Sequence, residues 1–203
     1  MQIINLYPGS FASNCYLLLS QGEAAVVDPS ANAKTILEAL EHHQATLKHI
    51  LLTHGHFDHI LSLEGLCDAT GLSACIHEED AELPADAHKN AFYTFFQTER
   101  SFQTPQIKCK DGDTLLLGVH TIRVVHTPGH TRGSVCYLCD EELLITGDTL
   151  FDGGYGRYDL YGGDGEILFQ SLKRLRSLNP SLPIYPGHGS TTTLGDALDQ
   201  LNL

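Results

Sequence analysis

The sequence has few basic residues, with 12 lysines and arginines against 25 aspartates and glutamates and a formal net charge of −13. A surface with this excess of negative charge repels the phosphate backbone of nucleic acids, so we expect no nucleic-acid partner. Charged residues make up only 18% of the chain and hydrophobic residues 42%. This balance excludes a disordered polyampholyte and favours a well-packed core.

Long apolar runs are also missing from the sequence. No stretch approaches the roughly 18 apolar residues that a membrane-spanning helix needs. The first ten residues have no basic start and lack the apolar core of a signal peptide. We therefore expect a cytoplasmic protein that does not enter a membrane, while its oligomeric state stays open.

Six cysteines are compatible with the reducing cytoplasm, where thiols stay free. Cys136 and Cys139 form a C-x-x-C pair, but they lie in an apolar run over residues 134–139 that predicts a strand. Side chains three residues apart on a strand point to opposite faces of the sheet. We therefore interpret both cysteines as core residues.

The first half of the chain alternates between two hydrophobic patterns. Short apolar runs predict strands at residues 2–6, 14–20, 24–28, 49–53 and 73–77. Between them, apolar spacing over residues 32–43 and from Ile60 to Gly71 predicts two helices. This alternation is typical of layered α/β proteins.

The second half continues the alternation without a repeat or a linker. Strands are predicted at residues 107–109, 114–117, 120–125, 134–139, 143–146 and 182–185. Helices are predicted over residues 165–178 and from about residue 193 to the end of the chain. We expect residues 1–203 to form a single domain.

An aromatic segment separates the two halves. Phe92, Phe95 and Phe96 have the i, i+3, i+4 spacing of one helical face. That face either covers the core or forms a lid or wall of a substrate pocket.

A cluster of polar side chains follows the predicted strand that ends at residue 53. His54, His56, Asp58 and His59 lie within six residues, a pattern expected by chance in roughly a few chains per thousand. Gly55 lets the backbone bend so that neighbouring imidazoles can converge. Ligands at the carboxyl ends of strands are typical of open α/β sheets. The cluster therefore predicts one half of a metal site.

Three later segments have the same character. His130, Asp148 and His188 each lie next to a glycine, directly after a predicted strand. Any one of them alone is more often a turn residue than a ligand. In combination with the first cluster, and in this order, they indicate the other half of the site.

The ordered set of histidines and aspartates resembles the metallo-β-lactamase superfamily, in its glyoxalase II-like branch, over almost the whole chain. The resemblance implies an α/β protein with a four-layer αβ/βα sandwich and the site along one edge of its two sheets. It also implies seven metal ligands: His54, His56 and His130 for a first metal, Asp58, His59 and His188 for a second, and Asp148 bridging both.

These ligand types suit two divalent ions, with zinc as the expected metal and iron or manganese as alternatives. A metal can lower the pKa of a bound water to about 7, which supplies hydroxide at neutral pH. We therefore predict a metal-dependent hydrolase acting on a thioester like S-lactoylglutathione, or on a related activated acyl compound. Asp58 and Asp148 are predicted to be catalytic, and Asp58 to orient the hydroxide as well as bind metal.

Substrate contacts are predicted for Arg157 and Tyr158, which follow Asp148 in a loop that resembles the Gly-x-Gly-Arg/Lys loop of glyoxalase II-like proteins. Arg157 can bind a substrate carboxylate through two parallel hydrogen bonds. Alternatively, it pairs with a neighbouring acidic residue such as Asp152 or Asp159. The chain ends fifteen residues after His188, whereas the longer enzymes continue with a helical domain that contacts glutathione. We thus expect a fold without that domain.

Other functions are weighed against the same residues. A persulfide dioxygenase of the same fold would hold one iron with two histidines and one aspartate, so the additional Asp58, His59 and His188 favour two metals. A purely structural zinc site is usually closed and often rich in cysteine, which does not fit seven ligands without a thiol. The acidic surface opposes a nuclease, and Asp148 replaces the cysteine common in β-lactamases.

The remaining histidines carry weaker signals. His126 precedes the His130 loop and either orients a ligand or has a purely structural role. His77, His88 and His120 lie in no recognisable motif.

Overall fold

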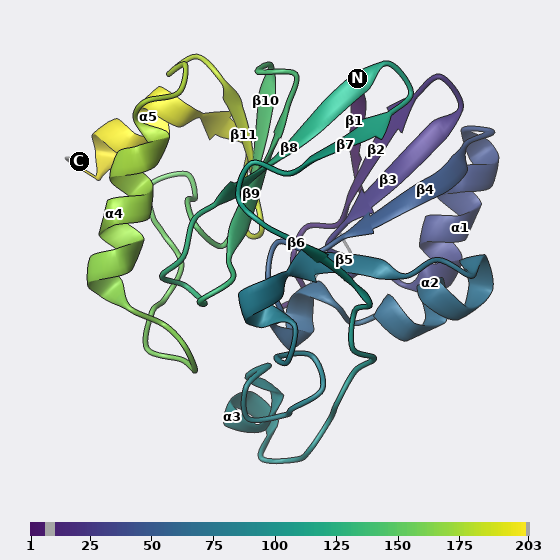
Figure 1. Cartoon of the computed structure of the whole chain (residues 1–203), viewed down its shortest axis with the longest axis horizontal. Coiled ribbons are helices and arrows are strands. Elements are labelled where there is room, and N and C mark those ends of the chain that lie inside the picture. The colour runs from purple at the N-terminus through teal and green to yellow at the C-terminus, as the bar shows by residue number, and fades with distance from the viewer. Residues whose placement is uncertain (7–10, 202–203) are drawn as a thin grey trace.

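The computed structural model describes residues 1–6 and 11–201 and contains two six-stranded sheets packed face to face (Figure 1). Helices α1 (Ala33–His42) and α2 (Leu63–Thr70) cover the outer face of the first sheet. Helices α4 (Gly165–Leu175) and α5 (Leu194–Gln200) cover the outer face of the second. This arrangement confirms the predicted four-layer αβ/βα sandwich.

The first sheet has the strand order β1-β2-β3-β4-β5-β6. Its strands are β1 (Gln2–Asn5), β2 (Tyr16–Ser20), β3 (Glu23–Val27), β4 (Thr46–Leu51), β5 (Ala74–His77) and β6 (Ile107–Cys109). The pairs from β3 to β6 are parallel. Because parallel neighbours need a crossover, α1 and α2 lie between consecutive strands. Gly71, with a φ of 69°, ends α2 in the left-handed conformation.

The second sheet has the order β12-β11-β10-β9-β8-β7. Its strands are β7 (Thr114–Leu117), β8 (His120–His126), β9 (Val135–Cys139), β10 (Leu143–Gly147), β11 (Pro183–Pro186) and β12 (Thr192–Thr193). Only β10 and β11 pair in parallel among these neighbours, and α4 makes their crossover.

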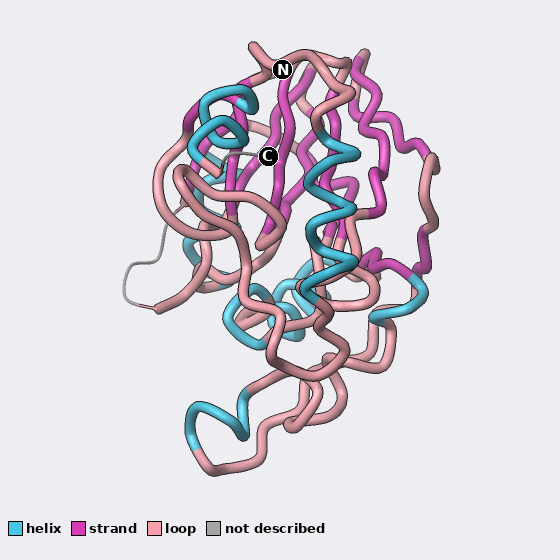
Figure 2. The backbone as a smooth tube through the Cα atoms, turned by 90° about the vertical axis from the view of Figure 1, so that its left-hand side faces the viewer, coloured by secondary structure: helices cyan, strands magenta, loops and turns pink. Residues whose placement is uncertain are grey.

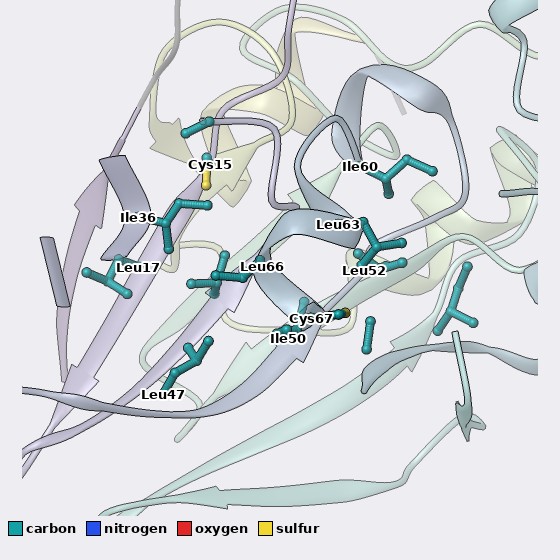
Figure 3. Packing of buried hydrophobic residues seen from close by; sticks show 14 of the residues in the cluster. Cys15, Leu17, Ile36, Leu47, Ile50, Leu52, Ile60, Leu63, Leu66 and Cys67 are labelled. Atoms are coloured by element: carbon teal, nitrogen blue, oxygen red, sulfur yellow. The ribbon is translucent and has the colours of Figure 1, made fainter. Parts of the chain in front are cut away.

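Three hydrophobic clusters hold the layers together. Leu17 and Ile36 belong to the cluster between the first sheet and its helices, part of which Figure 3 shows. Leu18, the next residue along β2, points to the other face and joins the cluster between the two sheets. Cys139 lies in that same cluster, whereas Cys136 packs beneath α4 and α5. The expected opposite orientation of these two cysteines is confirmed.

Several predicted boundaries are wrong by a few residues, for local reasons. The strand predicted at 49–53 is β4, which pairs from Thr46 to Leu51. The strand predicted at 14–20 begins only at Tyr16, because the Asn14 side-chain amide donates to the carbonyls of Pro186, at the end of β11, and of Gly189 beyond it. Strand β3 ends before Asp28, whose φ of 52° turns the backbone out of the extended conformation.

The predicted helix boundaries also shift. The helix predicted from Ile60 begins instead at Leu63, after a separate 3₁₀ helix at Phe57–His59. The helix predicted over residues 165–178 ends at Leu175. The last helix ends at Gln200, and its predicted continuation to residues 202–203 lies outside the described residues.

Helix α3 (Phe92–Phe96) extends away from the sandwich at one end, as Figures 1 and 2 both show. It is only five residues long, and residues at both of its ends have positive φ, 69° at Ala91 and 55° at Gln97. None of the helices among the described residues is both long and apolar enough to cross a bilayer.

Candidate metal centre

Segments that follow four strands meet at one end of the sandwich. His54 and His56 follow β4, His130 follows β8, Asp148 follows β10 and His188 follows β11. Since β10 and β11 are parallel, their carboxyl ends lie at the same edge. The two sheets are joined at this end by the Val135 amide, which donates to the Thr53 carbonyl over 2.9 Å.

Three buried imidazoles converge in the first group of this centre. His130 Nε2 lies 2.9 Å from His56 Nδ1 and 3.2 Å from His54 Nε2. Nitrogen ligands of a tetrahedral zinc lie roughly 3.3 Å apart, given Zn–N bonds of about 2.0–2.1 Å. The spacing of these nitrogens therefore fits a shared metal ion.

A second group lies beside the first. Asp58 Oδ2 is 3.1 Å from His188 Nε2 and 3.8 Å from His59 Nε2. The Asp148 carboxylate lies between the groups, with Oδ1 3.3 Å from His59 Nε2 and Oδ2 3.6 Å from His130 Nε2. The structure thus brings all seven predicted ligands together, with Asp148 in the central position.

Hydrogen bonds on the far side of the rings fix which nitrogen is free. His130 Nδ1 lies 2.6 Å from the Arg157 carbonyl, and His59 Nδ1 lies 2.8 Å from Asp28 Oδ2. A backbone carbonyl oxygen and a carboxylate oxygen are acceptors, so each Nδ1 donates. The Nε2 lone pair of each ring is then directed toward the centre, as metal ligation requires.

Besides His59, Asp28 also orients His54, through hydrogen bonds to Thr53. Its carboxylate accepts from the Thr53 amide over 2.8 Å and from the Thr53 hydroxyl over 2.7 Å. Because the hydroxyl proton is used there, Thr53 Oγ1 accepts from His54 Nδ1 at 3.0 Å. Sequence reasoning missed this role. The signal available was an aspartate at a strand end before Pro29.

The buried polar atoms at the centre test whether metal ions fit. Among the described residues, His59 Nε2 and Asp148 Oδ1 are buried at this centre without a hydrogen-bond partner. An unsatisfied buried polar atom costs about 1–3 kcal/mol. Cations beside these atoms would offset that cost. The donor set of imidazoles and carboxylates therefore fits divalent metals.

The protonation states also suit metal binding. Burial and the neighbouring histidines lower the pKa of His54 well below its ordinary value, and burial lowers the pKa of His56 to about 3. Burial by itself would raise the pKa of Asp148, but His59 and His130 outweigh it and lower the pKa. Neutral imidazoles and an ionised carboxylate are the forms that bind metals.

His59 differs from the other histidines because it lies among carboxylates. Burial acts to lower its pKa, but Asp148, Asp28 and Asp58 outweigh burial and raise the pKa well above its ordinary value. A proton on this ring is attracted by the same negative charge that would attract a metal ion.

Asp80 is a second residue that sequence reasoning missed. Its buried carboxylate accepts from the Thr131 hydroxyl over 2.6 Å and from the Gly133 amide over 2.7 Å, and the Gly55 amide also donates to it. Asp80 therefore connects the loop of His54 and His56 to the loop of His130. Burial raises its pKa to about 6. No spacing in the sequence predicts this role.

His126 supports the same loop from the outside. Its Nε2 lies 2.9 Å from the Arg132 carbonyl, and its ring stacks on His77 with the centroids 3.9 Å apart. His77, His126 and Glu79 also place donor atoms close together. Because the two rings are within 13° of parallel, their lone pairs run side by side rather than toward one point. These contacts favour the structural interpretation of His126.

A cavity of about 480 Å³ opens beside the metal centre. The predicted ligands His56, Asp58, Asp148 and His188 form part of its lining. The aromatic residues lining it are Phe11, Phe57, Phe95, Phe96 and Phe151. Phe92, in contrast, packs against the first core cluster. The aromatic face of α3 therefore serves both predicted purposes, since one ring covers core and two form a pocket wall.

Arg157 lines this cavity, but its guanidinium pairs with Asp159. The alternative partner, Asp152, instead accepts from Gln200. Tyr158 is not among the described residues that line the cavity, and its ring lies against Gly165. The predicted substrate contacts of Arg157 and Tyr158 stay predictions.

Comparison with known proteins agrees with this geometry. Residues 8–188 match the family model described as the metallo-beta-lactamase superfamily. The chain belongs to this superfamily. Its members are generally hydrolytic metalloenzymes that bind divalent metals.

Individual superfamily relatives cover nearly the whole chain. The hydroxyacylglutathione hydrolase GloC of Haemophilus influenzae is 34% identical, covering 92% of this chain and 90% of its own length. The structure of the BLEG-1 B3 metallo-beta-lactamase superposes with a TM-score of 0.90 at 31% identity, covering 98% of this chain and 97% of that one. TTHA1623 in a di-iron-bound form has a TM-score of 0.81 at 32% identity, covering 97% and 96%.

Asp28→Asn is expected to weaken metal binding by about 10- to 100-fold, because the anion that orients His59 is lost. Titration against a competing chromophoric chelator measures the affinity. Asp111→Asn is the control, since Asp111 pairs with Arg174 on the exposed surface. Equal metal affinity in Asp28→Asn and wild type would remove Asp28 from this role.

Proposed function

We propose that this protein is a cytoplasmic, dinuclear metal-dependent hydrolase that cleaves a thioester or a related activated acyl compound. The observation that carries the proposal is the pair of ligand groups with the Asp148 carboxylate between them, at the wall of an open cavity. All six cysteines lie within the described residues and are free, which supports a reducing compartment.

The ligand assignment follows the two groups. His54, His56 and His130 would hold one ion, Asp58, His59 and His188 the other, and Asp148 both. A bound pair of divalent ions would supply the Lewis acid and the activated water that hydrolysis requires. Five imidazoles among seven ligands favour zinc, although iron and manganese accept the same donors.

The residues of the cavity support acyl hydrolysis. Asp58 and Asp148 both line it, so their carboxylates are available to orient an attacking water by hydrogen bonds. Burial would raise the pKa of Asp58, but His59 and His188 lower it, so the carboxylate is ionised at neutral pH. A thiol has a pKa near 8.5, so a thiolate leaves with little help from a general acid.

Asp58→Ala tests this function. We expect kcat/KM for thioester hydrolysis to fall at least about 100-fold, because a ligand and a water-orienting group are lost together. The melting temperature of the metal-free protein should stay within a few degrees of wild type, since Asp58 is not part of the core. Asp152→Ala, which removes a surface carboxylate bonded to Gln200, is the control.

The assay uses enzyme of measured metal content on a panel of thioesters and lactones. Wild-type rates in Asp58→Ala would exclude Asp58 from the mechanism. Two metals per chain with no hydrolysis across the panel would contradict the proposed function. If the protein held one iron per chain and consumed oxygen when a persulfide was supplied as substrate, the result would instead support the dioxygenase alternative.

A further inference from the structure

We propose that the cavity selects thioesters carrying an uncharged, apolar substituent, and that Asp159 excludes anionic substrates by neutralising Arg157. This inference rests on the proposed hydrolase function and names the class of substrate. Two features of the cavity carry it, the aromatic wall and the Arg157–Asp159 pair.

The aromatic wall is built from three separate segments. Phe57 comes from the ligand turn itself, between His56 and Asp58. Its ring centroid lies 5.5 Å from that of Phe96, 5.7 Å from that of Phe95 and 6.2 Å from that of Phe11. The rings therefore form one continuous apolar surface that begins next to the metal ligands.

Part of this wall is open to solvent. Phe11 is 56% exposed, Phe95 52% and Phe96 41%, whereas Phe57 is buried. Exposed apolar surface of this kind, next to a few polar groups at the wall of a cavity, is typical of a site that receives an apolar ligand. Ala91 and Gln97, at the two ends of α3, have positive φ angles, and each costs about 1–2 kcal/mol for a residue with a side chain. The position of the two rings is therefore maintained by the fold against local strain.

Arg157 is the one residue with a permanent positive charge among the described residues that line the cavity. Its Nε and Nη2 donate to the two carboxylate oxygens of Asp159 over 2.7 and 2.8 Å. A substrate carboxylate would have to displace Asp159 from this bidentate pair, which already has the geometry that the substrate carboxylate would adopt.

The guanidinium contributes to the wall in another way. Its carbon lies 5.6 Å from the ring centroid of Phe95. With its in-plane donors turned toward Asp159, Arg157 stacks near the aromatic rings and extends the surface that an apolar group would contact. Arg157 would thus contact substrate through the face and stem of its side chain rather than by binding a carboxylate.

The first experiment compares kcat/KM on thioesters matched in reactivity. One arm varies the acyl group on N-acetylcysteamine, using phenylacetyl, acetyl and succinyl. The other arm keeps an acetyl group and varies the thiol, using benzyl mercaptan and glutathione. In at least one arm, we expect kcat/KM for the apolar substrate to exceed kcat/KM for the anionic substrate by about 10-fold or more. This is the discrimination that apolar pockets achieve. The arm that shows the preference identifies which side of the scissile bond lies on the aromatic wall.

Two variants separate the features that carry the proposal. Asp159→Asn removes the anion that pairs with the Arg157 guanidinium. In the arm where wild type prefers the apolar substrate, the ratio of kcat/KM for the anionic substrate to kcat/KM for the apolar substrate should therefore rise about 10-fold. Phe95→Ala combined with Phe96→Ala should lower the ratio of apolar substrate to acetyl by about 10-fold, through a higher KM. Both rings are about half exposed, so their truncation removes little core packing. Phe96→Leu, which keeps an apolar side chain, should restore most of the preference relative to Phe96→Ala.

The outcomes distinguish this inference from the proposed function. Turnover of all thioesters without an apolar preference, or an unchanged ratio in Asp159→Asn, would overturn the inference and leave the hydrolase function standing. Turnover of none of these thioesters by metal-loaded enzyme would also overturn the inference. If the lactones of the first panel were not hydrolysed either, the hydrolase function itself would be overturned.

Discussion

Removal of bound metal with a chelator is expected to lower the melting temperature by roughly 8–16 °C and to abolish hydrolysis. A ligand at a thousandfold excess over its Kd stabilises the native state by about 4 kcal/mol. For a chain of this size, each kcal/mol corresponds to about 2–4 °C. The physical reason lies in Asp28, Asp58 and Asp148, whose negative charges lie around one buried centre and repel one another without a cation.

Differential scanning fluorimetry on protein of known metal content measures this shift. Adding zinc to the stripped protein should restore both the melting temperature and the activity, which excludes irreversible damage by the chelator. Bovine serum albumin treated with the same chelator controls for effects on the dye. A melting temperature unchanged after verified metal loss would contradict the assignment of the seven residues as ligands.

Gly129→Ala is expected to destabilise the protein by about 2–5 kcal/mol and to weaken metal binding. Gly129 has a φ of 129°, and an added Cβ would overlap the backbone nitrogen and Cα of Leu168 in α4. Overpacking costs about 1–3 kcal/mol, and an unfavourable φ adds about 1–2 kcal/mol. His130 is the next residue, so any displacement of the loop moves a predicted ligand.

Urea denaturation measures the change in the free energy of unfolding. Gly65→Ala is the matched control, because its Cβ would lie 3.5 Å from that of Ala33, an ordinary contact, and φ is not positive there. Alanine at this position inside α2 should stabilise the protein by about 0.5–1 kcal/mol. Wild-type stability in Gly129→Ala would mean that the close approach of α4 to this loop is not required.

The ligand cluster was predictable because its signals are local. Five of the seven predicted ligands lie beside a glycine after an apolar run, and Asp58 and His59 fall in the same short cluster as His54 and His56. Neither property depends on distant residues. The same holds for the end of α2, where Gly71 adopts the left-handed conformation that its position predicts. The start of β2 was not predictable, because Asn14 is bound by carbonyls 172 and 175 residues away.

Supporting residues escaped prediction for the same reason. Asp28 and Asp80 are single carboxylates whose importance comes from the loops they connect, and no spacing marks them. Arg157 had two interpretations from the sequence, a substrate carboxylate or an acidic neighbour. The choice between Asp152 and Asp159 depended on where the loop placed each carboxylate.

The sequence by itself determined the class of fold and the seven candidate ligands, because hydrophobic period and polar side chains at strand ends are properties of short segments. The family resemblance also implied how those ligands are grouped. Only the tertiary structure decided how far apart the ligand atoms lie, which ring nitrogens are free, and what surrounds the cavity. Those properties arise where β4, β8, β10 and β11 end together and where two rings of α3 line the cavity beside them. Distances between such segments are set by the packing of two sheets, which no local pattern encodes.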